Sequence, residues 1–319
     1  MDVRAANVVP KRASTPAQAR GLVALDGAAL VSGIATADDA VAFGTAMLGD
    51  RVVRIAPQFE ATKASMEESE PLVAAQPVDE RGRKRMLGRY DLTQPAHNDG
   101  FGFGDFAPDH MFLWCDTPCT VGGSSFLIDA LKLATILAAE DPQLADFLWD
   151  EPIDHSEPNF PQGDPEPIAR FSPGGRAQVR SHPYQLPRVG PRETDHYPFV
   201  ERWGMAVAEA RSTGPRFRLE AGQMVCIDNY RMLHGREAYV DVDRRVVSIW
   251  AWTTSAINIP ASCRRPAPSD IRMASSRRRA RPAASIRFAT LAAPISSRRR
   301  TAPSSTLSGV RICPTMTSE

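Results

Sequence analysis

The stretch His97-Asn98-Asp99 places an imidazole and a carboxylate two residues apart. Side chains two residues apart on an extended strand point to the same face, so His97 and Asp99 can bind one ion together. A third donor, His234, follows 135 residues after Asp99. If a later strand brings His234 to the same face, the three side chains form a metal site. The pattern H-x-D is common by chance, so the surrounding sequence has to support this interpretation.

Two imidazoles and one carboxylate are the ligand set of non-heme Fe(II) oxygenases, which leaves coordination positions open for a co-substrate and O2. The five cysteines offer no comparable site. Cys115 and Cys119 lack a second pair at zinc-site spacing, and an odd number of scattered cysteines is no disulfide framework. A reducing, cytoplasmic location is therefore expected.

The charge is distributed unevenly along the chain. The whole chain carries +1, but residues 260–319 hold twelve Arg against Asp270 and Glu319, a net charge of +10. Residues 1–259 therefore carry −9, which argues against nucleic acid as a partner. No apolar run approaches the ~20 residues that span a bilayer, so no membrane association is expected either. The predicted partner is a small-molecule substrate, and the sequence leaves the oligomeric state open.

Three regions differ in composition. Residues 1–20 are polar and predict a loose leader, and residues 21–258 predict one folded domain. Residues 259–319 are rich in Arg, Ser, Pro and Ala, and they predict a disordered tail because they lack apolar content. A basic arm that binds nucleic acid is the less favoured interpretation of this tail.

Within the domain, periodicity and capping residues predict alternating strands and helices. Helices are expected over 35–48, begun near Thr36, over 130–140 after Asp129, and over 201–212. Strands are expected over 112–115, 125–128, 224–227 and 245–253. Residues 151–198, crowded with Pro and Gly, predict a long functional or partly disordered segment.

Glycines and aromatic residues follow the first two ligands directly, in Gly100-Phe101-Gly102-Phe103-Gly104. Glycine allows close backbone approach, and the two rings could wall a dry pocket. A hairpin turn with two core phenylalanines explains this segment equally well. Trp250 and Trp252 are expected in the core. Four histidines outside the motifs are expected at the surface: His110, His155, His182 and His196.

Together these features resemble the Fe(II)/2-oxoglutarate-dependent dioxygenases of the TauD/TfdA type, in the clavaminate synthase-like group. The likeness covers about residues 85–140 and 220–255. Three blocks carry it: His97-x-Asp99-Gly100, Gly122-Gly123-Ser124-Ser125, and Asp228-Asn229-x-Arg231-x-Leu233-His234-Gly235-Arg236 with Arg245 beyond. The resemblance implies a mainly β fold with flanking helices, a double-stranded β-helix (jelly roll).

The resemblance also implies roles for individual residues. His97, Asp99 and His234 match the iron ligands. Arg245 matches the arginine that pairs with the distal carboxylate of 2-oxoglutarate, a task that suits the guanidinium fork. Arg244 is its competitor, because strand alternation lets only one of the two face inward.

A hydroxyl and several candidate substrate contacts complete the expected site. Ser125 stands where the family often has Thr, whose hydroxyl helps to hold the same carboxylate. Contacts to substrate are expected from four residues next to the ligands: Asn98, Phe101, Phe103 and Arg236. For Arg236, a structural salt bridge is favoured over substrate binding, and the same holds for Arg231.

Two departures from family patterns narrow the reaction. Ile249 stands four residues beyond Arg245, where taurine dioxygenase has a sulfonate-binding arginine, so a sulfonate substrate is disfavoured. Asp99 is present where the related halogenases have a small residue, so halogenation is disfavoured.

The predicted activity is therefore hydroxylation of an unactivated C–H by Fe(II), 2-oxoglutarate and O2, with release of succinate and CO2. The substrate is expected to be a small polar molecule, a free amino acid or a natural-product intermediate, by analogy with the family alone. Three alternatives remain: a desaturase or cyclase on the same scaffold, a cupin-like metal hydrolase or isomerase without 2-oxoglutarate, and a basic-tailed binding protein.

Overall fold

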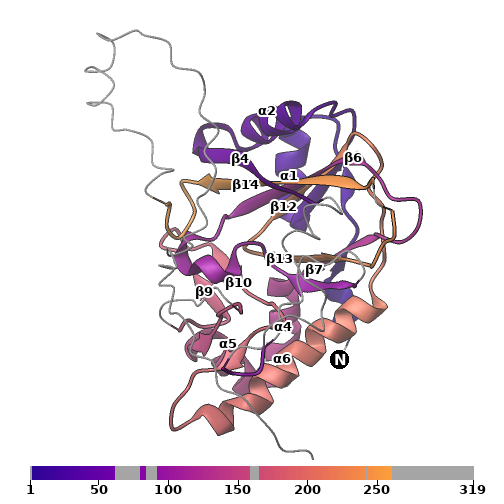
Figure 1. Cartoon of the computed structure of the whole chain (residues 1–319). Coiled ribbons are helices and arrows are strands. Elements are labelled where there is room, and N and C mark those ends of the chain that lie inside the picture. The colour runs from indigo at the N-terminus through magenta and orange to yellow at the C-terminus, as the bar shows by residue number, and fades with distance from the viewer. Residues whose placement is uncertain (1, 62–79, 84–91, 159–164, 242, 261–319) are drawn as a thin grey trace, which may run out of the picture. The chain divides into compact units, whose positions relative to one another are not determined.

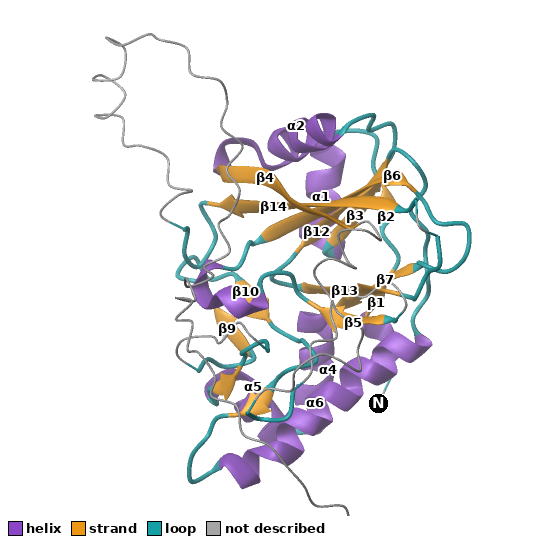
Figure 2. Ribbon diagram, viewed as in Figure 1, coloured by secondary structure: helices purple, strands orange, loops and turns teal. Residues whose placement is uncertain are grey.

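Two β-sheets lie one above the other in the computed structural model of this chain, with helices on both sides (Figures 1 and 2). The structure describes all residues except 1, 62–79, 84–91, 159–164, 242 and 261–319. All described residues lie in one compact unit, Met1–Pro266.

The larger sheet has six strands, which are antiparallel except for the parallel pair β2–β3. In spatial order they are β2 (Lys11–Arg12), β3 (Ala28–Val31), β12 (Gln223–Asp228), β6 (His110–Thr117), β14 (Arg245–Thr253) and β4 (Val52–Ala61). The smaller sheet is antiparallel throughout. Its order is β1 (Asn7–Val8), β7 (Ser125–Asp129), β13 (Met232–Arg236) and β5 (Gln94–His97).

Two helices begin where their capping residues predict them. Thr36 and Asp39 form a capping box at the start of α2 (Ala37–Leu48), and the Asp129 carboxylate accepts from the Lys132 N–H at the start of α4 (Ala130–Glu140). The other α-helices are α1 (Pro16–Asp26), α5 (Pro142–Asp150) and α6 (Glu193–Thr213), and the short 3-10 helices are η1 (Val3–Ala6), η2 (Gly49–Arg51) and η4 (Phe101–Phe106).

Alternation along the strands sorts side chains into three layers. The inner faces of the two sheets share one apolar cluster, in which Leu127 and Met232 of the smaller sheet accompany Met111 and Val225 of the larger one. The outer face of the larger sheet packs on α1 and α2, and the outer face of the smaller sheet packs on α4, α5 and α6. The space between the two inner faces is therefore where a buried site can form.

Several expectations from the sequence are confirmed. The strand expected over 245–253 matches β14, and the helices expected over 35–48 and 130–140 match α2 and α4. The segment 151–198 contains two short ladders, β8 (Ile153–Asp154) with β11 (Leu186–Pro187) and β9 (Ala169–Phe171) with β10 (Ala177–Val179). A mainly β fold with flanking helices is confirmed.

Other expectations are wrong. Residues 1–20 do not form a loose leader, because Val3 and Ala6 pack into the cluster under α4 and α6, and β1 pairs with β7. The helix expected over 201–212 begins earlier, at Glu193. The histidines expected at the surface are buried: His110, His155, His182 and His196. Short segments and lone histidines give no sequence signal of the partners that bury them.

The tail expected over 259–319 lies outside the described residues except for its first two positions. Among the described residues, no helix combines the length and the apolar character needed to cross a membrane.

Candidate metal centre

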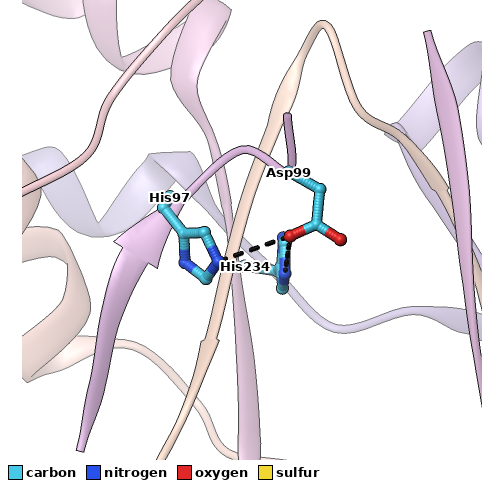
Figure 3. A group of neighbouring side chains, drawn as sticks. All are labelled: His97, Asp99 and His234. Carbon is cyan, nitrogen blue, oxygen red and sulfur yellow. Dashed lines mark ion pairs between the residues drawn. The ribbon is translucent and has the colours of Figure 1, made fainter. Parts of the chain in front are cut away.

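His97, Asp99 and His234 converge between the two sheets (Figure 3). Strand β13 brings His234 directly opposite His97, at the end of β5. Oδ1 of Asp99 lies 3.4 Å from Nε2 of His97 and 3.5 Å from Nε2 of His234. One donor atom from each residue lies within 4.8 Å of the other two. The three side chains predicted from the sequence as metal ligands are therefore brought together.

The protein holds His97 in a defined tautomer. Its Nδ1 lies 2.9 Å from the backbone oxygen of Pro95, which can only accept a hydrogen bond. Nδ1 therefore carries the proton, and the lone pair of Nε2 points toward Asp99 and His234. All three side chains are buried, so a bound ion would be shielded from bulk water.

The second oxygen of Asp99 is held by strand β14. Oδ2 accepts a hydrogen bond of 2.8 Å from Trp250 Nε1 and one of 3.2 Å from Ser248 Oγ. Oδ1 is thereby left to face the two imidazoles. Burial favours the neutral carboxyl, but His234 and His97 outweigh it and hold the pKa of Asp99 far below its usual range. The aspartate is thus prepared as a charged ligand through one oxygen.

Asn229 fixes the backbone of the ligand loop. Its Oδ1 accepts from the Asp99 N–H at 3.0 Å, and its Nδ2 donates to the backbone oxygens of Asp99 and Pro108. Asn98 reaches the opposite way, with Nδ2 donating to the oxygens of Asn229 and Met232. Because Asn98 Oδ1 also accepts from the Ser181 N–H, its amide is fully engaged in structure. These bonds give Asn98 a structural role, and its contact with substrate stays a prediction.

The donor set fits Fe(II). Two imidazoles and one carboxylate oxygen on one side of a centre leave the remaining directions open, as the 2-His-1-carboxylate arrangement requires. A structural zinc site would use four protein ligands, and the described residues supply these three.

The two neighbouring arginines point in different directions. The Arg245 side chain is 41% exposed and lies 3.2 Å from Asp116 Oδ2. Arg244 is only 7% exposed, and its guanidinium lies 4.5 Å from the ring centroid of Tyr239. Arg244 lies an even number of residues before Ser248 and Trp250, whose side chains point inward, so its side chain is expected on the same face. Of the two arginines, Arg244 is therefore the buried one, and the role of either toward 2-oxoglutarate stays a prediction.

One glycine of the pair expected near the site, Gly123, packs against Arg244. Gly123 has a positive φ of 66°, and a Cβ there would lie 3.6 Å from Arg244 Nε and 2.2 Å from Cys119 Sγ. Only glycine leaves room for this approach. The Gly122-Gly123 turn then leads into Ser125 at the start of β7.

Ser125 and Arg236 lie opposite each other in the pairing of β7 with β13. By alternation both share a face with His234, the inner face of the smaller sheet. Arg236 is buried, with its guanidinium 4.7 Å from the Tyr239 ring, and it donates to the backbone oxygens of Leu92 and Glu237. Two guanidinium groups thus lie against one tyrosine ring.

The two phenylalanines of the glycine-rich segment have different surroundings. Phe101 is buried and stacks on His182 at a ring-centroid distance of 4.0 Å. Phe103 is 55% exposed and meets the edge of Trp250, the residue that holds Asp99. The segment forms η4, a 3-10 helix, and not the alternative hairpin turn.

A buried histidine pair beside Phe101 was missed by the sequence analysis. The Tyr184 N–H donates to His182 Nδ1, so Nε2 of neutral His182 is protonated and faces His155 Nδ1 at 3.2 Å. His155 Nε2 lies 3.0 Å from the Glu166 backbone oxygen. Burial and the charge of Arg180 keep the pKa of both histidines well below the usual value. The sequence carries no signal of this pair because both histidines lie outside the recognised motifs.

Two curated relatives match about half of this chain. Gamma-butyrobetaine dioxygenase of Pseudomonas sp. (strain AK-1) is 28% identical over 153 residues, which cover 46% of this chain and 39% of that protein. Uridine-5'-phosphate dioxygenase of Streptomyces sp. is 28% identical over 160 residues, 48% of this chain and 58% of that protein. The chain therefore spans less than two thirds of the length of either relative.

Solved structures show the same fold at low sequence identity. Asparagine oxygenase, in complex with Fe(II), 2S,3S-3-hydroxyasparagine and succinate, has a TM-score of 0.51 and 16% identity, covering 74% of this chain and 77% of that one. A putative alpha-ketoglutarate-dependent taurine dioxygenase from Burkholderia xenovorans has a TM-score of 0.51 and 19% identity, covering 77% and 82%.

A sequence profile of a protein family also matches most of the chain. The sequence profile described as "Taurine catabolism dioxygenase TauD, TfdA family" matches residues 5–250, which include all three converging ligands. This match confirms the resemblance seen in the sequence to Fe(II)- and 2-oxoglutarate-dependent dioxygenases. The chain belongs to the TauD, TfdA family.

Proposed function

We propose that this protein hydroxylates an unactivated C–H of a small polar substrate with Fe(II), 2-oxoglutarate and O2, and releases succinate and CO2. The observation that carries the proposal is the buried convergence of His97, Asp99 and His234, with the second oxygen of Asp99 held by strand β14. We further propose that the two facing sheets form a double-stranded β-helix, and that residues 21–258, with the N-terminal segment packed on them, make up the catalytic domain.

In this proposal His97, Asp99 and His234 hold the iron. Fe(II) together with 2-oxoglutarate supplies the activation of O2 that C–H hydroxylation needs, and the protein supplies orientation and a dry site. The fixed tautomer of His97 and the single free oxygen of Asp99 mean that little reorganisation is needed when the metal binds.

We assign the distal carboxylate of 2-oxoglutarate to Arg244, with the hydroxyl of Ser125 as a second donor. Arg244 is buried, and among the described residues it has no carboxylate partner. A buried guanidinium without a carboxylate is costly, so an incoming carboxylate would be bound strongly. Arg236, on the same face as Ser125, adds positive charge on that side.

The substrate class rests on weaker support. The fold neighbour with 3-hydroxyasparagine suggests an amino acid, and the aromatic side chains of Phe101 and Phe103 lie two and four residues after Asp99. Desaturation or ring closure on the same scaffold differs from hydroxylation only in the later fate of the substrate.

The proposal is tested by adding Fe(II), 2-oxoglutarate and O2 to protein purified without oxygen, and measuring succinate across a panel of free amino acids. Succinate should form only with iron and should increase with one member of the panel. His97→Ala should abolish this increase. Succinate formation by His97→Ala at the wild-type rate would refute the assigned metal ligands.

A cupin-like hydrolase or isomerase on the same triad needs no 2-oxoglutarate. Binding of 2-oxoglutarate to the metal-loaded protein, followed by calorimetry, separates the two functions without a known substrate. Absence of binding would favour the hydrolase or isomerase.

A further inference from the structure

A cavity of about 310 Å³ is lined by residues of α1, η2, α4 and the turns before β10 and β13, and none of the three candidate metal ligands lines it. Successive side chains of strand β6 point to opposite faces of the larger sheet. Phe112 and Trp114 pack on α1 and α2, whereas Met111 faces the cluster between the two sheets. His110 shares the outward alternation and lines the cavity. Asp99, in contrast, contacts inner-face residues of β14. The cavity is thus distinct from the proposed 2-oxoglutarate site.

Four arginines from four different elements line this cavity. Arg20 comes from α1, Arg51 from η2, Arg176 from the turn before β10, and Arg231 from the turn before β13. Of the cavity-lining residues only Asp228 is acidic. This concentration of guanidinium groups favours a negatively charged ligand.

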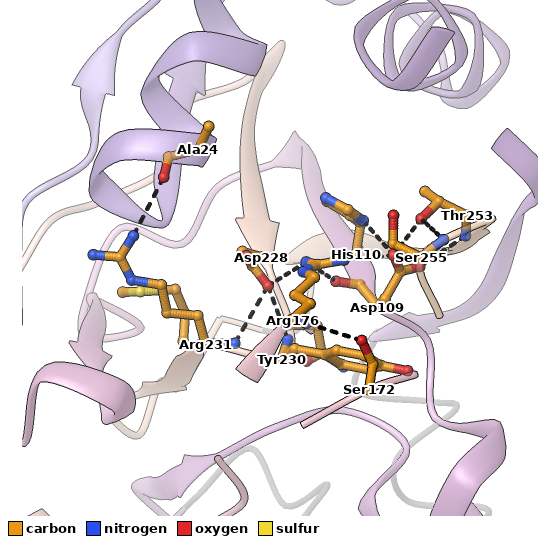
Figure 4. Close-up of polar contacts among 12 residues, drawn as sticks. Ala24, Asp109, His110, Ser172, Arg176, Asp228, Tyr230, Arg231, Thr253 and Ser255 are labelled. Carbon is orange, nitrogen blue, oxygen red and sulfur yellow. Dashed lines mark hydrogen bonds and ion pairs between the residues drawn. The ribbon is translucent and has the colours of Figure 1, made fainter. Parts of the chain in front are cut away.

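Two of the four arginines are already paired with carboxylates, and Figure 4 shows the first of them, Arg176. Arg176 donates to Asp109 Oδ2 at 2.6 Å and to Asp228 Oδ1 at 2.5 Å. Arg231 donates twice to Asp129 Oδ2, the nearer contact at 2.5 Å. These pairs fix two guanidinium groups in the wall of the cavity.

The other two arginines have no carboxylate partner among the described residues. Arg20 donates to the backbone oxygens of Met47 and Ala46 at the end of α2. Arg51 is exposed, and the described residues offer its side chain no hydrogen bond or ion pair. Two positive charges in the cavity are therefore not balanced.

A buried histidine adds a polar group to the same cavity. His110 Nδ1 lies 3.1 Å from Asp109 Oδ2, and the other ring nitrogen, Nε2, points away from that carboxylate (Figure 4). The Asp109 carboxylate is itself held by Arg176 and by the hydroxyl of Thr253. These contacts hold the Asp109 carboxylate in place beside the His110 ring.

We propose that this cavity binds the phosphate group of a small phosphomonoester. Guanidinium groups that approach from four elements suit the several oxygens of a tetrahedral phosphate better than a planar carboxylate. A phosphomonoester carries nearly two negative charges near neutral pH, which match the two unbalanced arginines. The cavity has room for a small organic group beside the phosphate.

The test is calorimetric titration of the full-length protein with inorganic phosphate as the probe. Arg51→Glu should weaken phosphate binding at least ~10-fold, because it removes a charge-assisted contact and adds a repelling charge. Arg12→Glu is the matched control, because Arg12 is exposed, donates a hydrogen bond to the Ser32 hydroxyl, and does not line the cavity. Arg12→Glu should bind phosphate within about twofold of wild type.

A second variant and a second ligand separate this cavity from the metal centre. Arg244→Ala should leave phosphate binding intact, and succinate should bind the Arg51 cavity more weakly than phosphate does. The proposal is overturned if wild type shows no phosphate binding, if Arg51→Glu equals Arg12→Glu, or if Arg244→Ala abolishes the signal. Tighter binding of succinate that also depends on Arg51 would overturn the assignment to phosphate.

Discussion

The indole N–H of Trp250 donates a hydrogen bond of 2.8 Å to Oδ2 of Asp99 and so fixes which carboxylate oxygen faces the two histidines. The contact joins β14 to the loop after β5, two segments more than 140 residues apart in the chain. A tryptophan that the sequence alone assigns to core packing therefore orients a candidate metal ligand.

Replacing Trp250 by Phe tests this role. Trp250→Phe keeps an aromatic ring and removes the donor, so Asp99 can rotate and offer the metal either oxygen. We expect metal affinity to fall about 10–100-fold, as is typical when a partner of a metal ligand is lost. Titration with Fe(II) under anaerobic conditions measures it. Trp252→Phe is the control, because Trp252 donates to the backbone oxygen of Phe106; equal affinities for the two variants would contradict the prediction.

The adjacent pair Arg244 and Arg245 provides its own control. Arg244→Ala should weaken 2-oxoglutarate binding at least ~10-fold, since a buried charge-assisted contact is lost. Arg245→Ala removes an exposed pair with Asp116 and should change 2-oxoglutarate affinity less than about twofold. Calorimetry of the metal-loaded protein distinguishes the variants. The reverse order of effects would restore Arg245 as the co-substrate residue.

Asn229 should be important for stability as well as for the site. Asn229→Ala leaves the Asp99 N–H and the backbone oxygens of Asp99 and Pro108 without these partners. We expect a loss of about 3 kcal/mol in the free energy of unfolding, because buried polar groups lose their hydrogen bonds. Urea denaturation measures the loss. Asn258→Ala, which removes a single local bond to the Ile259 N–H, should cost much less, and a similar cost for both would argue against this role.

The sequence predicted the metal ligands because their identity and spacing carry the chemistry. His97 and Asp99 are two residues apart, and the block around His234 is distinctive enough to be recognised without a structure. Strand β14 was equally visible, since a run of β-branched and aromatic residues has few other interpretations.

The remaining features depend on long-range contacts that local patterns do not encode. The choice between Arg244 and Arg245 depends on which of the two side chains faces inward. The sequence predicts that side chains alternate between the two faces of a strand, but not which set faces inward. His155 and His182 meet through the fold, 27 residues apart, so neither carries a motif. The engagement of Asn98 likewise depends on Asn229 and Ser181, which are distant in the chain.

The pH dependence of the free energy of unfolding should show how much the Asp109 carboxylate contributes to stability. Burial favours the neutral form of this carboxyl, but His110, Arg176 and Thr253 outweigh it and hold its pKa well below the usual range. Below the ordinary carboxyl pKa of about 4, the unfolded chain binds a proton that the folded protein does not, so stability is present above that pH and is lost as the pH falls. Each unit by which the pKa is lowered corresponds to about 1.4 kcal/mol.

Asp109→Asn should therefore lose stability at pH 7 and show a shallower decline between about pH 5 and 3 than wild type, measured by urea denaturation at each pH. Asp146→Asn, at an exposed position of α5, should decline in parallel with wild type. Parallel curves for wild type and Asp109→Asn would show that the Asp109 carboxylate contributes nothing to the acid limb.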